Sequence, residues 1–204
     1  MVSIEFLITS LIVVVTPGTG VIYSLSTGLT QGRRASVFAA LGCTVGIVPH
    51  LLATILGLAA LMHTSALAFQ LLKYAGVAYL FYLAFATWRD RSAFAVDAGT
   101  AQASRRQLVG KGLLVNTLNP KLTLFFLAFL PQFVDAAAPA ALPQLLLLSA
   151  VFMAMTFAIF VAYGFLAHAF RRQVIESARM QNLLRHGFAA AFAGLGARLA
   201  SGER

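Results

Sequence analysis

Two short segments of this chain contain the residues whose types and spacing could bind a small charged molecule. They are Thr16-Pro17-Gly18-Thr19-Gly20 and Asn116-Thr117-Leu118-Asn119-Pro120-Lys121. In each segment a proline directly follows Thr16 or Asn119, and threonine and asparagine side chains are good caps for helix N-termini. Proline is favoured at the first position of a helix. The sequence therefore predicts that a helix starts within each segment.

The two predicted helix starts offer two kinds of binding chemistry. The free N–H groups and the positive dipole end of a helix start attract an anion such as a carboxylate. Proline also lacks an N–H group and clashes with the carbonyl four residues earlier, so Val13 and Asn116 each lose a helical partner. Carbonyls freed in this way can accept hydrogen bonds from an ammonium group. Lys121 adds a positive charge, and Asn116 and Asn119, three residues apart, can share its face.

These considerations define the candidate binding residues. They are Thr16, Pro17, Gly18, Asn116, Asn119, Pro120 and Lys121. We hypothesise that the two segments meet and bind a zwitterion, its carboxylate at residues 119–121 and its ammonium at the freed carbonyls. Two simpler alternatives stay open, because a proline kink can serve packing alone and a lysine can extend toward an interface.

The composition places these segments in a membrane. Of the 204 residues, 60% are hydrophobic and 10% are charged, whereas soluble domains contain about 25% charged residues. A soluble domain of this size could not cover so much apolar surface. Cys43 is the only cysteine, so the chain has no intrachain disulfide and no cysteine-based metal site. A soluble enzyme and a disordered chain are excluded, and an all-α integral membrane protein is predicted.

Six apolar stretches are long enough to cross the hydrocarbon core, which takes about 20 residues of helix. They are residues 4–29, 35–61, 68–88, 108–134, 143–169 and 183–200. The last is short, so five spans remain an alternative. Residues 1–6 contain Glu5 and no lysine or arginine, which argues against a signal peptide, and the first stretch is expected to stay in the mature chain.

The basic residues predict the orientation. Of the 15 lysines and arginines, 11 lie in or beside the loops after the first, third and fifth spans: Arg33, Arg34, Arg89, Arg91, Arg105, Arg106, Lys111, Arg171, Arg172, Arg179 and Arg185. Positive loops stay in the cytoplasm, so both termini are predicted on the outer, periplasmic side of the cell (inner) membrane. This alternation accounts for the net charge of +9, and no nucleic-acid partner is expected.

The polar stretch 89–111 divides the chain into halves of three spans each. Residues 1–90 are predicted to form a first three-helix repeat, 91–107 a cytoplasmic linker, and 108–204 a second repeat inserted upside down. Pro17 and Pro120 lie near the middle of the first span of each half, so helices 1 and 4 are predicted to be broken at mid-membrane. Matched Gly/Pro interruptions are the best sequence pointer to a transporter's binding site.

The remaining polar residues suggest few other roles. His50, Lys121 and Glu5 are the candidates for proton coupling, although a lone buried histidine is more often simply hydrogen-bonded. The sequence lacks H-E-x-x-H, G-x-S-x-G and phosphate-loop motifs. We therefore expect no enzymatic activity, no cofactor and no metal site.

Small residues at four-residue spacing allow helices to approach closely. They are Gly42 and Gly46 in the second span, and Ala150, Ala154, Ala158 and Ala162 in the fifth. The pattern fits either packing inside the bundle or a homodimer.

The chain resembles the LysE/RhtB family of amino-acid exporters over nearly its whole length. The resemblance rests on the segments at 16–20, 32–33, 42–46, 57–61 and 72–83, and on a block formed by Asn116, Asn119, Pro120, Lys121, Phe125, Phe126, Pro131, Gln132 and Phe133. One departure is that Thr19-Gly20 stands where the family usually has Pro-Asn or Pro-Asp, which removes a polar side chain from the first segment.

The resemblance implies a secondary transporter of six spans in inverted repeats. Its partners would be a small amino-acid substrate or close derivative, protons and the lipid bilayer, with a homodimer as a possible assembly. Access to the site would alternate by rocking of the repeats. Two alternatives stay open, namely a membrane scaffold or assembly subunit without transport, and an exporter of another small solute or ion.

Overall fold

The structure is a computed structural model that describes four continuous stretches and isolated positions elsewhere. The described residues are 2–16, 18–61, 103–134 and 140–169, with isolated positions between 71 and 89 and between 182 and 200. Within this part of the chain every regular element is a helix and there is no strand. The predicted all-α class is confirmed for these residues.

The chain begins with two helices joined at an angle. Helix α1 (Ile4–Val15) starts after Ser3, whose hydroxyl accepts a hydrogen bond from the Phe6 N–H at 3.2 Å. Helix α2 (Thr19–Gln31) follows after the first candidate segment and is bent by 54° relative to α1. Helix α1 therefore ends and α2 begins beside the first candidate segment, and a single membrane span broken at mid-membrane stays a prediction here.

The next two helices follow a tight turn at Gly32. Its φ of 89° lies in the left-handed region, which favours glycine. Helix α3 (Arg33–Val45) and helix α4 (Val48–Leu61) are separated by a short turn, and Gly46 donates its N–H to the Gly42 carbonyl at 2.9 Å.

The second candidate segment also lies between two helices. Helix α6 (Arg105–Thr117) opens with a capping box in which Ser104 and Gln107 exchange hydrogen bonds. Helix α7 (Pro120–Leu124) continues into a π-helical turn η1 (Phe125–Phe129) and a 3-10 turn η2 (Leu130–Phe133). The stretch Pro120–Phe133 is bent by 52° relative to α6. Helix α8 (Ala141–Ala169) is the longest described helix.

Several of these helices suit a membrane by length and composition. Arg33–Gly57 and Ala141–Ala167 are each long and apolar enough to cross, and each bent pair would add one span, giving up to four. They correspond to four of the six predicted stretches. The stretches 68–88 and 183–200 lie outside the continuously described residues, so the count of six and the repeat arrangement stay predictions.

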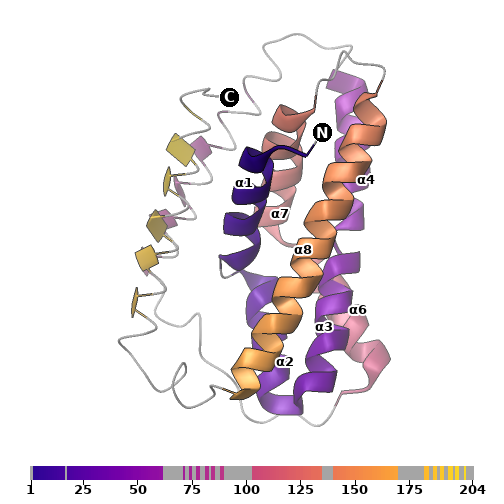
Figure 1. The fold of residues 1–204 in the computed structure, drawn as a ribbon, viewed down its shortest axis with the longest axis vertical. Coiled ribbons are helices and arrows are strands. Elements are labelled where there is room, and N and C mark those ends of the chain that lie inside the picture. Colours follow the sequence, from indigo (N-terminus) through magenta and orange to yellow (C-terminus); the bar gives the residue numbers. More distant parts are fainter. Residues whose placement is uncertain are drawn as a thin grey trace.

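The helices pack lengthwise (Figure 1), and glycines allow the closest approaches. A Cβ atom at Gly42 would lie 2.3 Å from the Val109 carbonyl oxygen, and one at Gly46 would lie 2.6 Å from that of Leu113. The Gly42–Gly46 pair therefore joins α3 to α6 inside the bundle. By contrast, the four alanines of α8 at 150, 154, 158 and 162 are exposed, and their role in a homodimer stays a prediction.

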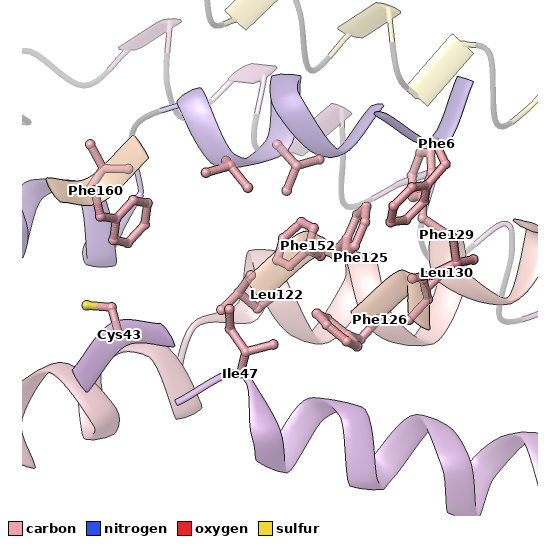
Figure 2. Packing of buried hydrophobic residues seen from close by; sticks show 14 of the residues in the cluster. Phe6, Cys43, Ile47, Leu122, Phe125, Phe126, Phe129, Leu130, Phe152 and Phe160 are labelled. Atoms are coloured by element: carbon pink, nitrogen blue, oxygen red, sulfur yellow. The ribbon is translucent and has the colours of Figure 1, made fainter. Parts of the chain in front are cut away.

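Phenylalanines fill the core beside the second candidate segment (Figure 2). Phe125 stacks on Phe152 of α8 with ring centroids 4.4 Å apart, and Phe126 meets the same ring edge-on at 5.4 Å. Phe133 packs edge-on against Phe6 of α1 at 5.5 Å. Aromatic pairs add about 0.5–1.5 kcal/mol each beyond area burial. These contacts fix η1 against α8 and η2 against α1.

Candidate functional site

Lys121 joins the two candidate segments. Its ammonium nitrogen donates to the main-chain carbonyl of Val13 at 2.9 Å and to that of Thr16 at 2.8 Å. The side chain is only 8% exposed, so the alternative in which it extends to an interface does not describe this structure. A Cβ atom at Gly18 would lie 3.0 Å from Lys121 Nζ, so a side chain at this position would crowd the ammonium.

The second segment is capped as the sequence predicts. Asn119 Oδ1 accepts from the Lys121 N–H at 3.1 Å, and Pro120 is the first residue of α7. Asn119 Nδ2 donates to Asn116 Oδ1 at 3.3 Å, and Asn116 Nδ2 donates to the Cys43 carbonyl at 2.8 Å. The two amides thus link α7 to α3.

His50 of α4 binds the Asn116 carbonyl, to which Pro120 cannot donate and which also accepts from the Asn119 N–H at 3.1 Å. His50 Nε2 lies 2.9 Å from the Asn116 carbonyl oxygen, and Nδ1 lies 3.4 Å from Thr123 Oγ1. A carbonyl oxygen only accepts, so Nε2 carries a hydrogen. The predicted loss of a helical partner at Val13 and Asn116 therefore has a common outcome, because each carbonyl receives a hydrogen bond from a basic side chain.

The first segment differs from the prediction in how its second helix begins. Thr16 does not cap α2, because it is the C-cap of α1 and its hydroxyl donates back to the Ile12 carbonyl. Threonine side chains often bond the carbonyl four residues earlier. The N-cap of α2 is Gly18, which has no side chain to offer. Pro17 lies outside the described residues.

Glu5 lies apart from the other candidates. It belongs to the first turn of α1, eight residues before Val13, and a helix rises 1.5 Å per residue. The distance along the helix axis is therefore about 12 Å. The structure brings together Thr16, Gly18, Asn116, Asn119 and Lys121, with His50 one residue away in the hydrogen-bond network, and it leaves Glu5 at a distance.

The site includes four residues that sequence reasoning missed. Tyr163 of α8 donates its hydroxyl to the Val15 carbonyl at 2.6 Å, and Thr54 donates to the carbonyls of His50 and Phe126. Thr123 bonds the Asn119 carbonyl at 3.3 Å. The four-residue spacing of Asn119 and Thr123, and of His50 and Thr54, was the available signal, since such pairs share a helix face.

Gly20 is the fourth missed residue. A Cβ atom there would lie 2.3 Å from Asn116 Oδ1 and 2.9 Å from the Phe160 ring. Glycine at this position lets α2 lie directly against the Asn116 amide.

The site offers hydrogen bonds and one positive charge. Its carbonyl oxygens, carboxamides and ammonium group can bind and orient a small charged molecule. Within the described residues, no group of three or more His, Cys, Asp or Glu side chains could hold a metal ion.

Comparison with known proteins gives the site a family context. Residues 11–203 match the family described as LysE type translocator. An uncharacterized membrane protein of Vibrio cholerae is 33% identical over 200 residues, which are 98% of this chain and 97% of the relative. A homoserine/homoserine lactone efflux protein of Salmonella typhimurium is 32% identical over 196 residues, covering 96% and 94%.

A leucine efflux protein of an Enterobacter species is 27% identical over 202 residues, covering 96% of this chain and 93% of the relative. No solved structure matches the chain. The family match spans nearly all of the sequence, and the matched residues include Val13, Thr16 and Lys121. This chain belongs to the LysE family of translocators.

Proposed function

We propose that this chain exports an amino acid or a close derivative across the cell membrane, by proton antiport and alternating access. The efflux proteins among its relatives support the substrate class. The observation that carries the proposal is the contact of Lys121 with Val13 and Thr16. It brings a cation, two carboxamides and the ends of two bent helices to one buried place.

Each bent helix pair would be one membrane span, broken at mid-membrane. The bends are similar, at 54° and 52°, and the two pairs run in opposite directions. In Figure 1 the chain descends from α1 to α2 and ascends from α6 to α7. Opposite direction is what two inverted repeats require. Residues 1–90 and 108–204 would form these repeats, with both termini on the periplasmic side.

The substrate would bind where the two bends meet. Its carboxylate would pair with Lys121 and with the side-chain amide of Asn119. Its ammonium would donate hydrogen bonds to the freed carbonyls. Lys121 and His50 hold those carbonyls in this structure. Substrate binding therefore requires that at least one of these basic side chains move.

His50 would carry the coupled proton. Its Nε2 is committed to the Asn116 carbonyl, while Nδ1 faces the Thr123 hydroxyl, which can accept or donate. The Thr123 hydroxyl already donates to the Asn119 carbonyl at 3.3 Å, so proton uptake at Nδ1 would let His50 donate to the Thr123 oxygen. Protonation of His50 would thereby act on the residue that caps α7.

The test is uptake into inverted membrane vesicles with an acidic lumen. Radiolabelled homoserine and leucine would be compared with other amino acids, and vesicles without the protein would serve as the control. The proposal expects accumulation of at least one amino acid, which collapses when an ionophore removes the pH gradient. No accumulation of any amino acid by folded, membrane-inserted protein would contradict it and favour a non-transporting membrane subunit.

A further inference from the structure

The ammonium of Lys121 lies in a cradle of two main-chain carbonyls that belong to another helix. The cradle consists of the carbonyl oxygens of Val13 and Thr16, at 2.9 Å and 2.8 Å from Nζ. Proline at position 17 leaves the Val13 carbonyl without its helical donor. Thr16 is the C-cap of α1, where carbonyls lack helical donors and carry the negative end of the dipole.

The two acceptors of the cradle select one chemical class. Both carbonyls need N–H donors, and an –NH3+ group has three, whereas a quaternary ammonium has none. Gly18 lies beside this nitrogen, because a Cβ atom at position 18 would lie 3.0 Å from Nζ, so a side chain there would crowd an ammonium in the cradle. A primary ammonium, which has three N–H donors, therefore fits the cradle, and a quaternary ammonium does not.

We propose that this cradle is a primary-ammonium site, which Lys121 fills in the substrate-free conformation and which the ammonium of the substrate takes over during transport. The inference rests on the proposed function and adds the step that opens the site. The carboxylate of an incoming amino acid attracts the Lys121 ammonium out of the cradle, and the substrate's own ammonium replaces it. The number of positive charges in the cradle is the same before and after the exchange.

The exchange explains why the site needs a zwitterion. A carboxylic acid without an amino group can attract Lys121 but cannot refill the cradle, so two buried carbonyls would lose their donors. Unpaired backbone groups are strongly disfavoured where water is absent. An amine without a carboxylate cannot displace Lys121. Lys121 thus acts as a tethered competitor of the substrate's ammonium.

The cradle can be tested without any transport assay. Lys121→Ala removes three carbons and the nitrogen, the atoms of propylamine, and leaves the carbonyls free. Thermal unfolding of the full-length protein in detergent would be followed with increasing propylammonium chloride, and with tetramethylammonium chloride at equal ionic strength. We expect propylammonium to raise the Tm of Lys121→Ala by about 3 °C or more, saturably.

The controls define the outcomes. Wild-type protein and Lys111→Ala should show no such rise, because Lys121 fills the cradle in both and Lys111 lies over the Tyr23 ring instead, 5.6 Å from its centroid. If Lys121→Ala does not fold, Lys121→Ser takes its place. An equal rise with tetramethylammonium, an equal rise in wild type, or no rise in the variant would overturn the proposal.

Different results would contradict the exporter proposal and the ammonium-site proposal. Vesicles that accumulate amino acids, together with a Lys121→Ala protein that ignores propylammonium, would keep the exporter and reject the cradle. Propylammonium binding without any amino-acid uptake would keep the cradle as an ammonium site and reject the exporter.

Discussion

The ammonium of Lys121 lies 2.9 Å from the main-chain carbonyl oxygen of Val13, 108 residues earlier in the chain. The contact is set up by two prolines. Proline at 17 frees the carbonyl of Val13, and Pro120 begins the helix on which Lys121 stands. A hydrogen bond to a charged donor contributes about 1.5–3 kcal/mol, so this contact is a substantial link between the two bent segments.

Gly20→Ala should destabilise the protein by disturbing the contact between α2 and Asn116. The new Cβ atom would lie 2.3 Å from Asn116 Oδ1 and 2.9 Å from the Phe160 ring, so both side chains must move. Overpacking of this kind costs about 1–3 kcal/mol. We expect a lower Tm in detergent, together with reduced amino-acid uptake because Asn116 belongs to the site.

Gly110→Ala is the matched control for that variant. Gly110 lies inside α6 with nothing within 4 Å of the added atom, and alanine is the better helix former by about 0.5–1 kcal/mol. Its Tm should be equal to or above that of wild type. A Gly20→Ala protein as stable and as active as Gly110→Ala would show that the contact with Asn116 is unimportant.

Gly42→Ala should separate α3 from α6. The added Cβ atom would meet backbone, at 2.3 Å from the Val109 carbonyl oxygen and 2.8 Å from the Val109 Cα, and backbone cannot turn aside as a side chain can. We expect a Tm loss larger than that of Gly20→Ala. Gly57→Ala in α4, where nothing lies within 4 Å, provides the control, and equal unfolding temperatures for both variants would contradict the packing described here.

His50→Gln should uncouple transport from protons while keeping the site intact. Glutamine retains an N–H donor for the Asn116 carbonyl but does not titrate near neutral pH. Exchange of labelled for unlabelled substrate should stay within about twofold of wild type, whereas accumulation driven by a pH gradient should be lost. The two activities are measured in the same vesicles.

The exposed His186 allows a matched control. His186→Gln should keep both activities, because His186 lies far along the chain from the hydrogen bonds that surround His50. Full pH-driven accumulation by His50→Gln would exclude His50 as the coupling residue, and Lys121 would then be the nearest candidate.

Part of this arrangement follows from the sequence alone. The helix start at Asn119 and Pro120 was predictable because both residues have a strong local preference for that place. The absence of the usual helical donor at the carbonyls of Val13 and Asn116 was predictable too, since a proline four residues later cannot donate to them. The apolar stretches likewise outlined the helices that suit a membrane.

Other features depend on contacts between distant segments and could not be predicted. Thr16 can cap a following helix or bond the carbonyl four residues back, and local preference does not decide between the two. The Gly42–Gly46 pair fits any close helix partner, and only the fold identifies α6. The hydrogen bond from Lys121 to the Val13 carbonyl likewise depends on how α7 lies against α1.

The most direct test of the central claim is uptake by Lys121→Met, with Lys111→Met as the control. Methionine keeps much of the apolar stem but removes the charge and the donors, whereas Lys111 is exposed on α6, away from the two carbonyls. Initial rates of amino-acid uptake would be measured in inverted vesicles at equal amounts of inserted protein. We predict at least a tenfold loss of rate for Lys121→Met and near wild-type rates for Lys111→Met. Wild-type uptake by Lys121→Met would contradict this prediction.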